Sequence, residues 1–158
     1  MPNWCENKLI VKGKSEEIVR FLERHVVDDI LDCNTFPVSA ALFGKNRFDH
    51  EKILDENTEE ITFWVSTKWG ANPAIQVCDI IAEDYPSLEF ELYYFSVESA
   101  FCGYYLPDSR GYMELDESNA EELEEKFLLF GVEAGFLEET SDGKYCCVHD
   151  TLTPRLLF

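Results

Sequence analysis

Hydrophobic and polar residues alternate in three stretches of the chain, and this pattern predicts three β-strands. In residues 3–12, every second side chain from Cys5 to Val11 falls on one face, because successive side chains of a strand point to opposite sides of a sheet. The same period of two recurs in residues 60–67 and 88–95, where β-branched and aromatic residues dominate. Each segment is therefore predicted to be a strand with one buried face.

Apolar residues spaced three and four apart predict three helices. The first covers residues 15–27, the second covers residues 72–85, and the third begins near Ser118, where Glu121 completes a capping box. Residues 28–57 contain no sustained period, because aspartate, asparagine, proline and glycine interrupt it. We interpret them as a long irregular connection.

The order of elements indicates a fold class. Two further strands are predicted at residues 100–106 and 144–149. From residue 60 onward the order is then strand, helix, strand, strand, helix, strand, which is the split βαβ pattern of the ferredoxin-like fold. We predict one α+β domain over residues 1–158, with a ferredoxin-like βαββαβ sandwich at about residues 60–150. The N-terminal strand and helix are predicted to extend its antiparallel sheet at one edge.

Length and charge narrow the classes of function. The chain has 158 residues, the size of one domain, and its 13 Lys and Arg oppose 32 Asp and Glu for a formal net charge of -19. A hydrophobic content of 46% excludes a disordered acidic tail. The charge argues against direct nucleic-acid binding, which uses clustered Lys and Arg, and against binding to an anionic membrane.

The N-terminus and the cysteines predict a cytoplasmic protein. Residues 1–6 lack the basic and apolar regions of a signal peptide, and no apolar run approaches the roughly 18 residues of a membrane span. The six cysteines are scattered, as expected for small buried hydrophobic residues in a reducing compartment. Because neither they nor His25, His50 and His149 have metal-ligand spacing, no metal or cofactor is predicted.

Three motifs of the chain are specific enough to compare with known families. They are the opening MPNWCxNxLxVxG of residues 1–13, the sequence Phe63-x-x-x-Thr67-x-Trp69, and the segment from Tyr85-Pro86 to Phe101-Cys102-Gly103. Together they resemble the YubB-like proteins of phages and conjugative plasmids. The resemblance covers roughly the first two thirds of the chain. It implies a ferredoxin-like domain of uncharacterised function in a mobile element, and it brings no catalytic residues. From Met113 onward the chain matches no pattern of that family.

Two candidate catalytic arrangements have simpler structural interpretations. Cys5 could act as a nucleophile if His25 or His149 supplied a base, but its place in the alternating pattern predicts a core residue. Glu89 and Glu91 would lie about 7 Å apart on one strand face, a separation compatible with paired acid and base chemistry. Such a face is more often the solvated side of an antiparallel sheet. The protein is therefore predicted not to be an enzyme.

The acidic residues concentrate near the C-terminus. Residues 114–142 contain eleven Asp and Glu and a single base, Lys126. The predicted acidic face consists of Glu114, Asp116, Glu117, Glu121, Glu122, Glu124 and Glu125. On a helix, the four glutamates from Glu121 to Glu125 place one charge per roughly 2 Å of axis, close to the about 1.7 Å per charge of duplex DNA. A surface that mimics nucleic acid is one interpretation, and a solvated face that maintains solubility is the other.

Three functions remain open from the sequence. The leading hypothesis is a non-enzymatic accessory protein of a mobile element, whose acidic face binds a basic host or phage protein. In its sharpest form, the face mimics nucleic acid and inhibits a nucleic-acid-binding or defence protein of the host. The second is a small-molecule-binding domain with a pocket beside residues 28–57, near Trp4 or Trp69. The third is an enzyme that uses Cys5 or a carboxylate pair.

Overall fold

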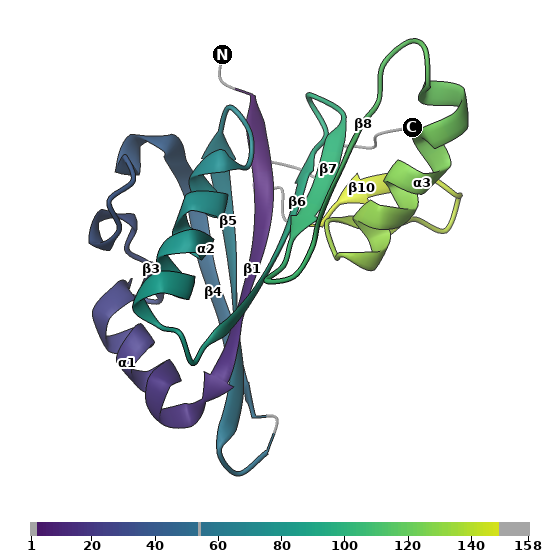
Figure 1. Cartoon of the computed structure of the whole chain (residues 1–158). Helices are drawn as coiled ribbons and strands as arrows, with labels where there is room; N and C mark the ends of the chain where they lie inside the picture. The colour runs from purple at the N-terminus through teal and green to yellow at the C-terminus, as the bar shows by residue number, and fades with distance from the viewer. Residues whose placement is uncertain (1–2, 54, 149–158) are drawn as a thin grey trace.

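A six-stranded antiparallel sheet forms the centre of the protein. The computed structural model describes residues 3–53 and 55–148, and within them the side chains of all but residues 49–53. The strand order is β4-β5-β1-β6-β7-β8 (Figure 1). The strands are β1 (Trp4–Lys14), β4 (Phe43–Ile53), β5 (Thr58–Lys68), β6 (Glu89–Ser96), β7 (Phe101–Tyr105) and β8 (Arg110–Glu114).

Helices cover both faces of the sheet. α1 (Ser15–His25) and α2 (Asn72–Asp84) lie on one face, whereas α3 (Ala120–Glu133) packs on the other with a small hairpin of β9 (Leu137–Glu139) and β10 (Tyr145–Cys147). The α1–β4 connection holds β2 (Val26–Val27), β3 (Ile30–Leu31) and the 3-10 turns η1 (Cys33–Thr35) and η2 (Ala40–Leu42). Among the described residues, no helix has the length and apolarity to span a membrane.

The predicted α+β, ferredoxin-like class is confirmed, but different strands form the motif. β1 and β4 are joined through α1 with β5 between them, and β5 and β6 are joined through α2 with β1 between them. These two interleaved βαβ units run from Trp4 to Ser96, instead of residues 60–150. β1 therefore lies inside the sheet and not at its edge, consistent with the burial of both Leu9 and Ile10, which face opposite sides. β7, β8 and α3 are the additions.

The predicted alternation places the side chains in two cores. On the face covered by α1 and α2, Val11, Phe63 and Leu92 come from the three central strands and are fully buried. On the opposite face, Trp64 and Phe95 pack under α3 and the segment that follows it. Since neighbouring residues of β5 and β6 enter different cores, both strands are covered on both sides.

The prediction of an irregular connection over residues 28–57 is wrong for its second half, where the structure has the eleven-residue strand β4. The pairing of β4 with β5 shifts register between Phe43 and Asn46 and again between Asp49 and Lys52. A bulge adds an unpaired residue to one strand and interrupts its alternation. The period of two is therefore lost although the strand is formed.

His25, at the end of α1, is buried in a closed hydrogen-bond network. Its Nδ1 lies 2.6 Å from Thr35 Oγ1 and its Nε2 2.9 Å from the Tyr85 hydroxyl. Because Thr35 Oγ1 donates its own proton to the Asp32 carbonyl, it accepts from Nδ1–H, and Tyr85 donates to Nε2. The neutral ring is thus fully satisfied, and its burial lowers the pKa of His25 from 6.5 to about 4.

We expect the ring of His25 to stay neutral in the folded protein until the pH approaches 4. A base whose folded pKa lies below its unfolded value contributes full stability above the unfolded pKa, near 6.5, and loses it as the pH falls toward 4. The loss should be on the order of 3 kcal/mol, because each unit of the pKa difference corresponds to about 1.4 kcal/mol. NMR titration of the ring protons measures this directly, and a midpoint near 6.5 would show that the network does not hold the neutral form.

Candidate interaction surface on helix α3

Side chains from the β8–α3 connection fix the start of α3. The Asp116 carboxylate accepts hydrogen bonds from the Ser118 hydroxyl and from the backbone N–H groups of Ser118 (2.7 Å) and Asn119 (3.2 Å), and these bonds lower the pKa of Asp116. Asn119 precedes the first helical residue, and its side chain bonds back to Asp116 N and Glu114 O. The predicted capping box of Ser118 and Glu121 is therefore replaced by an Asp116–Asn119 pair. Glu121 and Glu122 lie in the first turn, where their negative charges interact favourably with the positive end of the helix dipole.

An aromatic stack fixes which face of α3 is buried. Phe127 stacks on Phe95 of β6 with ring centroids 4.5 Å apart, and Phe95 stacks on Phe136 at 5.6 Å. Gly131, one turn after Phe127, brings the helix close to the sheet, since a Cβ there would lie 2.9 Å from Phe95 and 2.6 Å from Leu137. The line from Phe127 to Gly131 therefore faces the sheet, and the opposite side of α3 faces solvent.

The end of α3 is held by a lysine from the centre of the sheet. Lys8 Nζ on β1 donates to the carbonyl of Ala134 at 3.3 Å and lies 5.4 Å from the centroid of the Trp64 ring. A positive charge at this point stabilises the helix, because the C-terminal end of the helix dipole is negative. Gly135 then takes a left-handed conformation (φ +89°), which is typical of a glycine that follows the end of a helix. Both ends of α3 are thus anchored, so its outer face is presented in one orientation.

The solvent-facing side of α3 combines carboxylates with two apolar side chains. We call it the α3 face and define it as Glu121, Glu122, Glu125, Leu129, Val132 and Glu133. At about 100° per residue these six positions fall within roughly 120° of arc. Leu129 is 54% exposed and Val132 is 36% exposed. The four glutamates are exposed, and their carboxylates make no hydrogen bond or ion pair with another described residue.

The structure divides the predicted acidic face into several groups. Glu121, Glu122 and Glu125 share the α3 face, whereas Glu124 points toward its flank and is half-buried. Glu114, Asp116 and Glu117 precede the helix. Of these, Asp116 is used as the cap and Glu114 accepts a hydrogen bond from the Tyr112 hydroxyl at 3.0 Å. The seven residues are therefore not one continuous surface.

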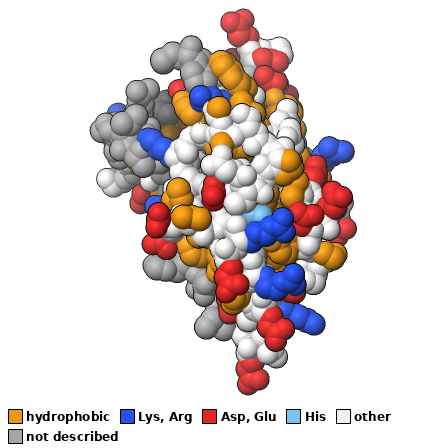
Figure 2. Space-filling model, turned by 90° about the vertical axis from the view of Figure 1, so that its left-hand side faces the viewer, with side chains coloured by type: hydrophobic (Ala, Val, Ile, Leu, Met, Phe, Trp, Pro, Cys, Tyr) orange, Lys and Arg blue, Asp and Glu red, His pale blue; other side chains and the backbone are white. Residues whose placement is uncertain are grey.

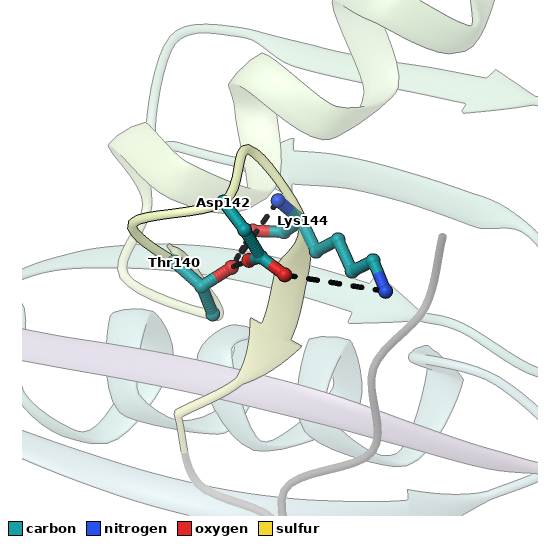
Figure 3. Close-up of polar contacts among 3 residues, drawn as sticks. All are labelled: Thr140, Asp142 and Lys144. Carbon is teal, nitrogen blue, oxygen red and sulfur yellow. Dashed lines mark hydrogen bonds and ion pairs between the residues drawn. The ribbon is translucent and has the colours of Figure 1, made fainter.

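Asp142, one more acid of this region, also has a structural role. It lies in the turn between β9 and β10, where its carboxylate accepts a hydrogen bond from the Thr140 hydroxyl and lies 4.0 Å from Lys144 Nζ (Figure 3). Thr140 and Lys144 also pair through their backbones, with Thr140 N donating to Lys144 O at 2.7 Å. Gly143 supplies the positive φ of the turn, +80°. Asp142 and Gly143 together therefore shape the turn that joins β9 to β10.

The opposite side of the molecule has a different charge pattern. Figure 2 shows the side that includes α1, where Lys and Arg are interspersed with Asp and Glu. On that side Arg20 pairs with Glu17 at 2.9 Å. The α3 face has four glutamates, and Lys126 is the one base of its helix. The negative charge is therefore unevenly distributed between the two sides.

The two tryptophans predicted to line a pocket are close along the backbone, where Trp69 N donates to Asn3 O at 2.9 Å, but their surroundings differ. Trp4 packs over Gly44 of β4, with Lys68 Nζ 5.7 Å from its ring centroid. Trp69 is 65% exposed and has a left-handed backbone (φ 65°). A shallow hollow of about 160 Å³ lies elsewhere, lined mainly by Tyr94, Tyr104, Tyr105, Arg110 and Tyr112. Neither Trp4 nor Trp69 lines that hollow.

The residues proposed for catalysis are engaged in packing and pairing. Cys5 is fully buried, its thiol donates to Glu6 O at 3.7 Å, and burial raises its pKa, so the nucleophilic thiolate is disfavoured. Both ring nitrogens of His25 are bonded to other residues, and His149 lies outside the described residues, as does the side chain of His50. Glu91 forms an ion pair with Lys12 at 3.5 Å, which matches a solvated sheet face.

The sequence reasoning missed three members of the α3 face: Leu129, Val132 and Glu133. The spacing of Leu129 and Val132 from the core residue Phe127 could have revealed two of them. Leu129 follows Phe127 by two positions, so it lies about 200° around the helix from the buried ring. An apolar residue on that side, three before Val132, does not belong to the core stripe. A search for apolar residues outside the core stripe would have found both.

Comparison with known proteins identifies the domain. Residues 47–132, more than half of the 158, match the family described as the ferredoxin-like domain in Api92-like protein. Searches of curated proteins and of solved structures gave no match.

The matched range differs from that of the resemblance to YubB-like proteins. It reaches residue 132 and so includes nearly all of α3, whereas the resemblance stops before Met113. It begins at residue 47, inside β4, and so leaves out the opening motif of residues 1–13. The narrower likeness to YubB-like proteins therefore stays a proposal. The chain belongs to the family of the ferredoxin-like domain in Api92-like proteins.

Proposed function

We propose that this protein is a non-enzymatic interaction module that binds a basic protein through the α3 face. The observation that carries the proposal is the combination of two solvent-exposed apolar residues, Leu129 and Val132, with four glutamates whose carboxylates bond to no other described residue, all on one anchored helix. Apolar centres with charged rims are common in protein interfaces. The carboxylates would steer a positively charged partner toward the face, and the apolar pair would be buried on contact.

The composition of the α3 face favours a protein-like contact over imitation of nucleic acid. A mimic of duplex DNA needs a nearly unbroken row of charges, about one per 1.7 Å. On the α3 face, Leu129 and Val132 interrupt the row between Glu125 and Glu133. A basic surface that also carries an exposed apolar residue would complement this arrangement better than a phosphate-binding groove.

The setting we propose is that of a mobile-element accessory protein acting in the cytoplasm. The likeness of the opening motif to YubB-like proteins of phages and conjugative plasmids supports the first part. Six free thiols among the described residues suit a reducing compartment, which supports the second. The partner would then be a basic host or phage protein.

Neutralising the α3 face should abolish salt-sensitive binding. Wild-type protein, immobilised and exposed to a lysate of its native cells, should retain a basic protein at about 50 mM salt and release it at about 500 mM, because screening shortens the range of charge interactions. The purified partner should bind the variant Glu121→Gln, Glu122→Gln, Glu125→Gln and Glu133→Gln at least roughly tenfold more weakly.

A matched control separates the α3 face from net charge. The variant Glu16→Gln, Glu23→Gln, Asp28→Asn and Asp29→Asn removes the same number of charges at exposed positions near α1. It should bind the partner within about twofold of wild type, allowing for weak long-range attraction. Equal weakening by both variants would mean that only overall charge matters, and the α3 face would lose its role.

A further inference from the structure

The two edges of the sheet differ in how well they are protected from pairing with another strand. On β4, two register shifts distort the edge, and the Asn46 side chain bonds to both N and O of Leu31 on β3. Bulges and covering segments are the usual protection of edge strands. β8, at the other edge, pairs with β7 without a shift. Among the described elements, β7 is the one with which β8 has extended contacts.

The hydrogen-bond pattern shows which backbone groups of β8 point outward. Leu106 N donates to Ser109 O and Leu115 N donates to Ala100 O, at opposite ends of the β7–β8 ladder. Bonded and non-bonded pairs alternate in an antiparallel ladder, so Gly111 and Met113 bond to β7. The N–H and C=O groups of Arg110, Tyr112 and Glu114 therefore point away from the sheet. Of these, Glu114 O also accepts a bond from Asn119.

The side chains of β8 make this edge complementary to itself. Arg110, Tyr112 and Glu114 share one face of the strand, with a positive residue at one end and a negative residue at the other. Tyr112 between them is 62% exposed. In an antiparallel pair centred on Tyr112, Arg110 of each copy would lie opposite Glu114 of the other. Opposite charges at directly opposed positions stabilise strand pairs.

We propose that β8 is a homodimerisation edge, at which two copies of this chain pair antiparallel about Tyr112. The two Tyr112 residues exchange backbone hydrogen bonds, and each Arg110 exchanges them with Glu114 of the second copy. The contact is isologous and closes after two subunits, so it forms a dimer and not a fibre. The two sheets become continuous, and because the dyad is perpendicular to them, both α3 helices lie on the same side.

Sedimentation equilibrium over about 5 to 500 µM protein tests this pairing, a range suited to a small interface. Salt is kept at about 0.15 M, where the screening length of about 8 Å damps repulsion between distant carboxylates. Wild type should show a concentration-dependent dimer. Tyr112→Pro should be monomeric throughout, because it removes an outward N–H while leaving the bonds to β7 intact. Tyr112→Thr, which keeps that N–H, should still dimerise.

A charge exchange tests the register. Arg110→Glu should weaken the dimer roughly tenfold by opposing like charges at both ends, and Glu114→Arg should do the same. The double variant Arg110→Glu with Glu114→Arg should restore the wild-type association constant. Circular dichroism confirms that each variant is folded. A wild type that stays monomeric over the whole range, a Tyr112→Pro dimer as strong as wild type, or a double variant no tighter than the single ones would overturn the proposal.

Discussion

Truncation of Phe127 to alanine is expected to lower the free energy of unfolding by about 3–5 kcal/mol, the usual cost of removing a buried aromatic ring. Phe127 is 3% exposed and stacks on Phe95 at 4.5 Å. Its removal leaves a cavity between α3 and the sheet, which Gly131 on the same side of the helix has no side chain to fill. Urea unfolding, followed by tryptophan fluorescence and circular dichroism, measures the loss.

A pair of control substitutions makes this result specific to the buried face. Phe127→Leu keeps most of the apolar volume and should cost less than about 1.5 kcal/mol. Leu129→Ala, on the same helix but 54% exposed, should change stability by no more than about 0.5 kcal/mol. If Leu129→Ala destabilised the protein as much as Phe127→Ala, the assignment of Leu129 to the solvent-facing side would be wrong.

Replacing Asn7 by alanine is expected to cost about 2–4 kcal/mol. Asn7 is 1% exposed, and its Nδ2 donates to Val65 O and Thr67 Oγ1, both at 2.9 Å. Thr67 Oγ1 in turn donates to Gly70 O at 2.6 Å, so this network holds the turn after β5. Alanine leaves the Val65 carbonyl and the Thr67 hydroxyl without these bonds in the core, and each unsatisfied buried group costs about 1–3 kcal/mol.

A double-mutant cycle measures the Asn7 network. Thr67→Val removes the central hydroxyl, and the double variant Asn7→Ala with Thr67→Val should be less destabilised than the sum of the two single changes, by about 1 kcal/mol. Chemical denaturation gives all four free energies. Additive losses, or a cost below about 1 kcal/mol for Asn7→Ala, would mean that the network does not hold the end of β5.

The strands found from the sequence are those that alternate between buried and less buried positions over part of their length. In β1, β5 and β6 one face is buried under α1 and α2, whereas the other face is buried at only some positions. β4 escaped detection because its bulges break the period. β8 was not predicted because an edge strand is weakly buried. Gly111 and the exposed Tyr112 therefore show no alternation of apolar and polar residues. Assigning β1 to an edge was wrong because strand order depends on contacts between distant segments, which a period does not report.

Charge in the sequence indicated the segment that contains the α3 face but not the full composition of that face. Glu121, Glu122 and Glu125 are exposed together as predicted, because the periodic core residue Phe127 sets the orientation of α3. The roles of Asp116 and Asp142 were hidden, since a capping or turn aspartate resembles a surface charge until its hydrogen bonds are known. Lys8 likewise gave no sign of its contact with Ala134, which is 126 residues away.

Site-specific photo-crosslinking on the α3 face tests the central claim most directly. A photoreactive amino acid is placed at Leu129, or at Val19 on α1 as a control, which is 47% exposed. If the α3 face binds a basic protein, the probe at Leu129 should trap one in native cells, the probe at Val19 should not, and neutralising Glu121, Glu122, Glu125 and Glu133 should abolish the adduct. Equal trapping at both positions, or an adduct at Leu129 that persists without the four charges, would contradict the account.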